Sequence, residues 1–194
     1  MLTDRFSDAL TYAERLHRAQ TRKGNDIPYV AHLLAVAAVV LEWGGDEDTA
    51  IAALLHDAVE DQGGAETLAE ITRRFGDRVA AMVVACSDSV TTSKQEKAPW
   101  AERKRKHLAK LAEAGPEVAL ISAADKLHNL GAMIRDVRRD GVETMRRFNA
   151  SPADTVWYYA SVGRALARYR AQAPVDEIEA ATAELADLLG LEVP

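Results

Sequence analysis

At 194 residues with a hydrophobic fraction of 48%, the chain is long enough to bury one core, and its 28% of charged residues are spread without a tract that predicts disorder. The net charge of −6 argues against a protein that mainly binds nucleic acid, although a local cluster of lysine and arginine could still hold a small anionic ligand. The chain has no apolar run of about 18 residues, its N-terminus lacks the pattern of a secretory signal, and the single Cys86 excludes an internal disulfide, so we expect a cytoplasmic protein without membrane contact.

The spacing of apolar residues predicts helices almost throughout and no convincing strand. Near the N-terminus, Phe6, Leu10, Ala13 and Leu16 recur at spacings of three and four residues, which puts them on one face of a first helix. Similar spacings continue along the chain, with no repeat at a fixed period. We therefore expect an all-α, compact helical bundle that forms one domain over 1–194, in which 150–194 contributes additional C-terminal helices.

Proline, glycine and capping residues set the expected ends of these helices. Pro28 suits the first turn of the second helix, and Asp46 and Asp77 are expected to cap the helices that follow them. The segment 88–99 is the most irregular. In chain order, the predicted helices span residues 4–19, 28–43, 46–59, 66–75, 77–87, 100–114 and 116–140, then one that starts at Ser151-Pro152 and one over 175–189.

The segment LLHDAVED, residues 54–61, carries the strongest local signal. An apolar helix ends by presenting His56, Asp57, Glu60 and Asp61 within six residues, and residues four apart share a helical edge. Three carboxylates this close repel one another unless a cation binds or they turn into water. An HD pair alone is a common dipeptide, so a solvated helix end explains this segment about as well as a metal site does.

Two other residues favour the metal site over the solvated helix end. His32 lies early in an apolar helical stretch, where an isolated histidine is more often a satisfied core residue. Asp125 follows the apolar VALISAA, where an unpaired charge would be costly, and His128 and Asn129 share its helical face. With the HD pair, these residues offer two imidazoles and two carboxylates. Such a mixed set suits Mn, Fe or Zn and differs from the cysteine set of a structural zinc site.

This H…HD…D pattern in a helical chain resembles the HD superfamily of metal-dependent phosphohydrolases. More narrowly, four blocks resemble, in order, the hydrolase domain of Rel/Spo-type alarmone enzymes: AQTRKGNDIPYVAH, AALLHDAVED, ITRRFGDRVAAMV and SAADKLHNL. The resemblance covers about residues 8–140, and the four blocks together are far more specific than any one of them. The chain is too short to add the synthetase and regulatory domains of the long Rel enzymes, so it resembles a stand-alone small alarmone hydrolase.

The resemblance implies metal-dependent hydrolysis of the 3′-diphosphate of (p)ppGpp, and it assigns roles by position. The metal, usually manganese with Fe²⁺ or Zn²⁺ as alternatives, would be held by His32, His56, Asp57 and Asp125. The acidic pair beside the reacting water is matched by Glu60 and Asp61. Positions that face the substrate are matched by Arg22, Lys23, Asn129 and, at a position that holds lysine or arginine, Lys126.

More cations follow the irregular segment, in the run RKRKH over 103–107. A solvated helical face is one explanation of this run. The functional explanation is that Lys97, Arg103 or Lys104 contacts the substrate phosphates. Farther along, WYY at 157–159 is expected in the core, although it could equally support a homo-oligomer, and the sequence leaves that open.

Other interpretations stay open. Gln62 stands where the long Rel enzymes commonly have threonine, and Ala58 is smaller than the usual valine, so the nucleotide is in doubt. Deoxynucleotides, nucleoside monophosphates or NADPH are alternative substrates. A non-catalytic alarmone sensor is an alternative of another class, but every ligand position and Glu60 are filled. Nucleic-acid binding through RKRKH is opposed by the net charge.

Overall fold

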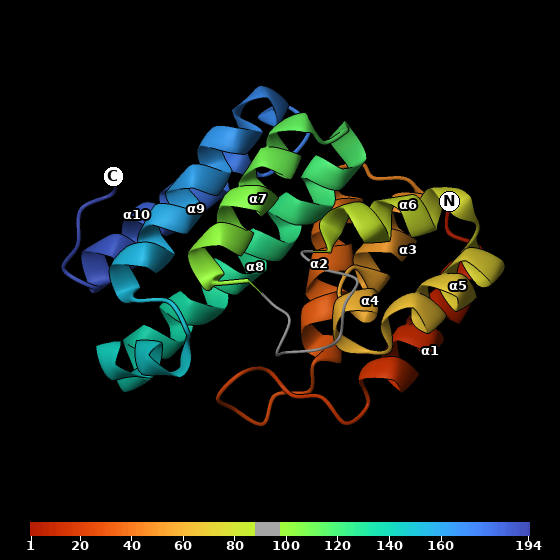
Figure 1. Ribbon diagram of the computed structural model, residues 1–194, viewed down its shortest axis with the longest axis horizontal. Coiled ribbons are helices and arrows are strands. Elements are labelled where there is room, and N and C mark those ends of the chain that lie inside the picture. The colour runs from red at the N-terminus through yellow and green to blue at the C-terminus, as the bar shows by residue number, and fades with distance from the viewer. Residues whose placement is uncertain (88–97) are drawn as a thin grey trace.

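A computed structural model describes residues 1–87 and 98–194 of the chain (Figure 1). Apart from one isolated antiparallel bridge between Thr21 and Pro28, these residues form helices, turns and loops, which confirms the predicted all-α fold. None of the described helices is both long and apolar enough to cross a membrane. The elements are α1 Asp4–His17, α2 Val30–Glu42, α3 Glu47–Leu55, α4 Ala58–Asp61, α5 Gly64–Phe75, α6 Asp77–Cys86, α7 Trp100–Glu113, α8 Pro116–Asp140, η2 Val142–Arg147, α9 Pro152–Leu166, η3 Ala167–Tyr169 and α10 Val175–Leu188.

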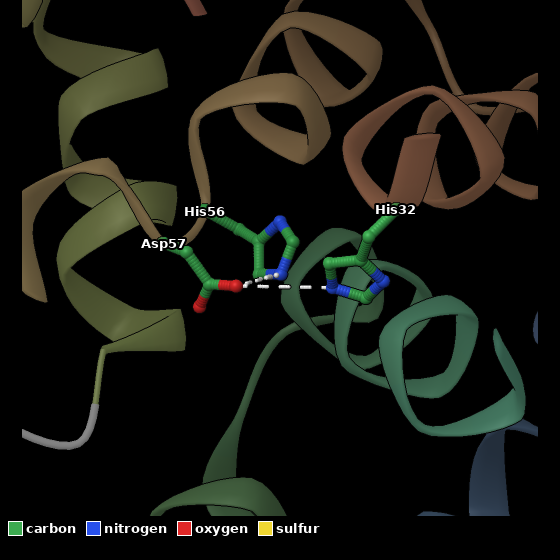
Figure 2. A group of neighbouring side chains, drawn as sticks. All are labelled: His32, His56 and Asp57. Carbon is green, nitrogen blue, oxygen red and sulfur yellow. Dashed lines mark ion pairs between the residues drawn. The ribbon is translucent and has the colours of Figure 1, made fainter. Parts of the chain in front are cut away.

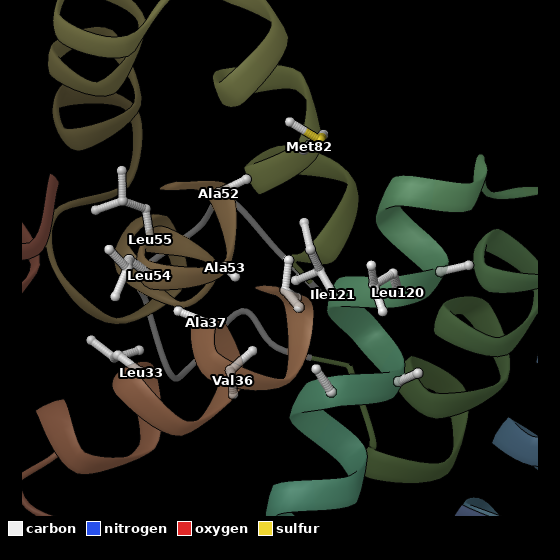
Figure 3. Packing of buried hydrophobic residues seen from close by; sticks show 14 of the residues in the cluster. Leu33, Val36, Ala37, Ala52, Ala53, Leu54, Leu55, Met82, Leu120 and Ile121 are labelled. Atoms are coloured by element: carbon white, nitrogen blue, oxygen red, sulfur yellow. The ribbon is translucent and has the colours of Figure 1, made fainter. Parts of the chain in front are cut away.

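The helices α2, α3 and α8 form the centre of the core (Figure 3). Every residue of α3 from Thr49 to Leu55 is buried, so other parts of the chain cover this short helix on all sides. Leu33, Val36 and Val40 are buried residues of α2, and Ile121 is one of α8. The 25-residue α8 contacts α2, α3 and α6 and also α9 and α10. It therefore joins the N-terminal helices to the C-terminal ones.

The prolines and the serine cap at the starts of α8 and α9 lie where the sequence predicts them. Pro116 and Pro152 occupy the first turns of α8 and α9, and α8 spans the predicted residues 116–140. The Ser151 side chain accepts from the backbone N–H of Asp154 at 3.0 Å, which satisfies one of the free amides at the start of α9. Proline therefore marks the beginnings of α8 and α9, and at α9 a serine cap accompanies it.

The prediction of one continuous helix over 46–59 is wrong. α3 ends at Leu55 and α4 begins at Ala58, so His56 and Asp57 lie at a break. The Nδ1 atom of His56 lies 2.8 Å from the carbonyl oxygen of Ala53. In a continuous helix this carbonyl would accept from the amide of Asp57. The histidine side chain thus takes over a backbone hydrogen bond where the helix stops.

Other predicted helix starts also differ, and α5 begins at Gly64 rather than at Glu66. The second helix begins at Val30 rather than Pro28, because Pro28 pairs with Thr21 and the amide of Tyr29 donates to the carbonyl of Gln20. The cap of α6 is Gly76 rather than Asp77, which is already the first helical residue. The φ of Gly76 is +89°, a conformation that favours glycine, and it lets α5 and α6 follow each other without a longer loop.

Replacement of Asp46 with alanine tests the cap of α3. The Asp46 carboxylate accepts from the Thr49 amide at 2.9 Å and pairs with Arg78 at 2.6 Å. We expect Asp46→Ala to lower the free energy of unfolding by about 1 kcal/mol at pH 7, measured by urea denaturation. Asp26→Ala, which removes an exposed loop carboxylate, should change it by less than about 0.5 kcal/mol.

The same cap should weaken in acid. Burial alone would raise the pKa of Asp46, but hydrogen bonds from Thr49 and Arg78 lower it from 3.8 to about 2. Because the pKa is lowered in the folded state, this contribution is present above pH 3.8 and is lost as the pH falls towards 2. A stability difference between Asp46→Ala and the unmodified chain that stays constant over this range would contradict the assignment.

Candidate active site

The four predicted ligands come from three places in the fold. His32 lies in the first turn of α2, His56 and Asp57 lie at the break between α3 and α4, and Asp125 lies in α8. Ligand atoms of His32, His56 and Asp57 lie within 4.8 Å of one another, and Figure 2 shows these side chains pointing toward one another. Oδ1 of Asp125 lies 3.3 Å from Nε2 of His32 and 3.9 Å from Nε2 of His56. The structure therefore brings the four residues together.

His56 is held by a backbone contact that fixes its protonation. Its Nδ1 faces the carbonyl oxygen of Ala53, which only accepts, so Nδ1 carries a proton and Nε2 faces the other ligands. Burial alone would lower the pKa of His56, but the Asp57 carboxylate, 3.0 Å from Nε2, raises it to about 9. Burial would raise the pKa of Asp57, and the neighbouring His56 holds it well below its ordinary value. The Asp57 carboxylate thus favours a positive charge beside it.

His32 is supported by a second histidine. The His32 ring is 1% exposed, and its Nδ1 lies 2.8 Å from Nδ1 of His128. Burial lowers the pKa of both rings, to about 4 for His128, so both are neutral at pH 7 and one Nδ1 donates to the other. When His32 is the donor, its Nε2 keeps a lone pair facing Asp57 and Asp125. Metal-bound histidines in proteins are commonly oriented by such an outer hydrogen bond.

Both carboxylates also have partners outside the ligand set. The hydroxyl of Tyr29 donates to Oδ2 of Asp57 at 2.5 Å. The Asn129 amide donates to Oδ1 of Asp125, and the Lys126 ammonium pairs with Oδ2 of the same carboxylate. Burial would raise the pKa of Asp125, but Lys126 and the two histidines hold it well below its ordinary value. Both side chains are therefore held as anions beside the histidines.

The donor set fits a divalent cation. The Nε2 atoms of His32 and His56 are buried and make no hydrogen bond among the residues that the structure describes, although they face Asp125 and Asp57 at 3.3 Å and 3.0 Å. Buried polar atoms nearly always have a partner, so these two nitrogens require an explanation. Imidazole nitrogen with carboxylate oxygen is a ligand combination that Mn²⁺, Fe²⁺ and Zn²⁺ accept. A bound cation would supply both nitrogens with their missing partner.

A cavity of ≈ 420 Å³ opens beside this group, and His56, Asp57 and Asp125 form part of its wall. Lys97, a predicted substrate contact, lies outside the described residues, so the structure says nothing of it. Every other residue predicted as catalytic or substrate-binding lies on the cavity wall: Glu60, Asp61, Arg22, Lys23, Arg103, Lys104, Lys126 and Asn129.

Four cations of the wall come from two segments far apart in the sequence, and we call them the two cationic pairs. Arg22 and Lys23 lie in the loop between α1 and α2, and Arg22 donates to Oδ1 of Asn129 at 2.6 Å. Arg103 and Lys104 lie near the start of α7. Cations on a wall that also carries carboxylate ligands suit a substrate with phosphate groups beside a metal.

Parts of the predicted segments RKRKH and WYY and the residue Lys126 line the cavity but also have other surroundings or partners. The run RKRKH is divided, because Arg105 and Lys106 are exposed whereas Arg103 and Lys104 line the cavity. Lys126 differs from the cationic pairs in pairing with the predicted ligand Asp125. In WYY, both tyrosines are buried, as expected for the core, and both also line the cavity.

Sequence reasoning missed several residues of the wall. Tyr29, which binds Asp57, stands three residues before His32 inside a recognised block, so its position on the same helical side was available as a signal. Arg147 also lines the cavity and pairs with the buried Asp136. Nothing in the local sequence distinguishes Arg147 from the exposed arginines near it.

An all-α fold with this ligand set on a cavity wall defines the class of an HD-type metal-dependent phosphohydrolase. The family model of the HD domain matches residues 9–151, and the chain belongs to that family. The family and the donor set together imply a divalent metal. The resemblance of the H…HD…D pattern to the HD superfamily is thus confirmed.

Individual relatives agree with this assignment. A GTP pyrophosphokinase of Streptomyces coelicolor is 41% identical over 143 residues, which are 72% of this chain and 16% of that protein. A guanosine-3′,5′-bis(diphosphate) 3′-pyrophosphohydrolase of Xenopus tropicalis is 37% identical over 68% of this chain and 69% of its own length. A solved structure of a metazoan ortholog of SpoT that hydrolyses ppGpp matches with a TM-score of 0.73 and 29% identity over 99% of both chains. The chain therefore spans a small part of the Streptomyces relative and nearly all of the metazoan structure.

Removal of one carboxylate ligand should abolish tight metal binding. We expect Asp57→Ala to weaken Mn²⁺ binding by at least about a hundredfold, because loss of an outer-shell partner alone costs about 10–100-fold. Titration calorimetry on chelator-stripped protein measures the affinity, with Asp26→Ala as the matched control. An affinity equal to that of the unmodified chain would remove Asp57 from the ligand set.

The outer contact of His32 makes a second, smaller prediction. His128→Phe keeps a ring of similar size but removes the nitrogen that meets Nδ1 of His32. We expect about a tenfold weaker Mn²⁺ affinity with the helical circular-dichroism signal unchanged. Unchanged metal affinity in a folded variant would show that His32 is oriented by packing alone.

Proposed function

We propose that the chain hydrolyses the 3′-diphosphate of (p)ppGpp to pyrophosphate and GDP or GTP, with a divalent metal, manganese by the resemblance, as its cofactor. The observation that carries the proposal is the group of four candidate ligands at the cavity, in which the buried Nε2 atoms of His32 and His56 make no hydrogen bond among the described residues, together with the two cationic pairs. The substrate is supported by the Xenopus pyrophosphohydrolase and by the ppGpp-hydrolysing SpoT ortholog. The cytoplasmic location expected from the sequence stays a prediction.

In the proposed reaction, the oxygen of a water molecule bonds to the phosphorus attached to the ribose 3′-oxygen. The bond between that phosphorus and the 3′-oxygen breaks, pyrophosphate leaves, and the 3′-oxygen takes up a proton. A divalent cation at the four ligands would lower the pKa of a water molecule and polarise a phosphoryl oxygen.

The chain's own residues have three tasks in this reaction. Glu60, on the cavity wall, accepts the proton of the attacking water as general base, and Asp61 orients that water. The two cationic pairs bind the phosphate oxygens and offset the negative charge of the diphosphate group while it is transferred from the ribose 3′-oxygen to water. Lys97, Lys126 and Asn129 stay predicted substrate contacts.

The proposal is tested by incubating chelator-stripped protein with ppGpp, with and without Mn²⁺, and separating the products by ion exchange. Manganese-dependent release of GDP and pyrophosphate, absent in Asp57→Ala, is the expected result. Turnover of a deoxynucleotide, a nucleoside monophosphate or NADPH in place of ppGpp would overturn the substrate but keep the metal site. Tight ppGpp binding without turnover would favour an alarmone sensor.

Glu60→Gln separates catalysis from metal binding. The amide has the shape of the carboxylate but does not accept a proton from water at pH 7. We expect turnover of ppGpp to fall by about 10²–10⁴-fold, the usual contribution of a general base, while Mn²⁺ affinity changes by less than about threefold. A Glu60→Gln enzyme with normal turnover would exclude Glu60 as the base.

A further inference from the structure

Gln20 connects the predicted catalytic carboxylate of Asp61 to the loop between α1 and α2. The main chain of Gln20 is fixed on both sides, because its N–H donates to the carbonyl of His17 and its carbonyl accepts from the N–H of Tyr29, each at 2.9 Å. Its side-chain Nε2 donates to Oδ2 of Asp61 at 2.8 Å. The side-chain amide of Gln20 therefore contacts the Asp61 carboxylate from a part of the loop whose main chain is fixed.

The oxygen of the same amide is also engaged. Oε1 of Gln20 accepts from Nε2 of Gln62 at 2.6 Å and lies 2.7 Å from Nδ1 of His17. Asp61 decides the orientation, because a carboxylate only accepts and must face the amide nitrogen. Turning the amide over would set its oxygen against the carboxylate and its nitrogen against another amide nitrogen. Only one orientation of Gln20 satisfies its neighbours.

His17 is held by the same arrangement. It is 2% exposed, and because Gln20 Oε1 is an acceptor, Nδ1 of His17 carries the proton. Burial lowers the pKa of His17, so the ring is neutral at pH 7. The ring stacks on Tyr29 with 5.1 Å between centroids and 18° between planes, and Tyr29 in turn donates to Asp57. His17 thus supports contacts to both Asp61 and Asp57.

We infer that Gln20 is a positioning residue for hydrolysis, which holds the Asp61 carboxylate in one orientation through Oδ2. The inference rests on the proposed function. Asp61 is exposed on the cavity wall, where water alone would leave its carboxylate free to rotate. A group that orients a reacting water must stay within hydrogen-bond reach of it, so a fixed carboxylate is more effective than a rotating one.

The same inference accounts for a departure from the family pattern. Gln62 stands where the long Rel enzymes commonly have threonine. Its side-chain amide donates to Gln20, and its backbone carbonyl accepts from the hydroxyl of Thr67. Gln62 therefore acts on Asp61 through Gln20 rather than by touching the cavity residues itself.

The competing explanation is that Gln20 only ties the loop to α4. A simple tether would lower stability without a specific effect on the chemical step. A double-mutant cycle distinguishes the two, because a residue that acts through Asp61 loses its kinetic effect once Asp61 no longer accepts the hydrogen bond in the same way. We therefore compare Gln20→Ala in the unmodified chain and in Asp61→Ala, which has no side-chain oxygen to accept the hydrogen bond.

Steady-state hydrolysis of ppGpp with Mn²⁺ gives the cycle. We expect Gln20→Ala to lower kcat by about tenfold with KM and Mn²⁺ affinity within about twofold, the size expected for one hydrogen bond to a charged group. In the Asp61→Ala background the same change should lower kcat by less than about twofold. Gln172→Ala, at an exposed glutamine near the end of the chain, is the matched control and should change nothing.

Gln62→Ala provides a second test that leaves Gln20 in place, and we expect about a threefold loss of kcat because His17 still holds the amide. This variant keeps the inference testable if Gln20→Ala does not fold. Equal losses from Gln20→Ala in both backgrounds, or no loss in either, would overturn the inference while turnover by the unmodified chain keeps the proposed function. Absence of ppGpp turnover by the unmodified chain would overturn the proposed function itself.

Discussion

The structure depends on holding two carboxylates and two histidines together at one largely buried point. Asp57 and Asp125 are anions in a place where burial disfavours charge, and their mutual repulsion adds to that cost. Each is compensated by a different set of neighbours: His56 and Tyr29 for Asp57, and Lys126 and Asn129 for Asp125. The Nε2 atoms of the two histidines face these carboxylates but make no hydrogen bond among the described residues, which leaves a place between the four side chains that a divalent cation fits.

The rest of the fold supplies the rigidity that this arrangement needs. Because Thr49–Leu55 is buried on all sides, α3 cannot slide without opening the core, and its end fixes where His56 begins. The break after Leu55 then lets two adjacent residues face the same point, which a continuous helix would not allow, since successive side chains are about 100° apart. α8, packed against α2 and α3, brings Asp125 to that point from the other side.

The sequence predicted most helices well, and it singled out four candidate ligands that the structure brings together, because both leave local signals. Apolar spacing and capping residues lie within one helix, and the HD pair and Asp125 lie inside recognisable blocks. The break at His56 was missed because it depends on a side chain binding Ala53, where propensity alone favours a continuous helix. Contacts such as Tyr29 with Asp57 join residues 28 positions apart, and apolar periodicity carries no information about such polar pairs.

The loop between α1 and α2 contributes more to the site than its cations. Through Gln20 it contacts Asp61, through Tyr29 it contacts Asp57, and through Arg22 and Asn129 it reaches Asp125. This short loop is thus hydrogen-bonded, directly or through one intermediate residue, to three carboxylates: one at the break between α3 and α4, one in α4 and one in α8. Because the bridge between Thr21 and Pro28 closes the base of this loop, its contacts are made by one unit. A phosphate group that binds the guanidinium of Arg22 would therefore contact the same hydrogen-bonded loop that orients the three carboxylates. Binding of such a phosphate and the orientation of the carboxylates are thus physically coupled.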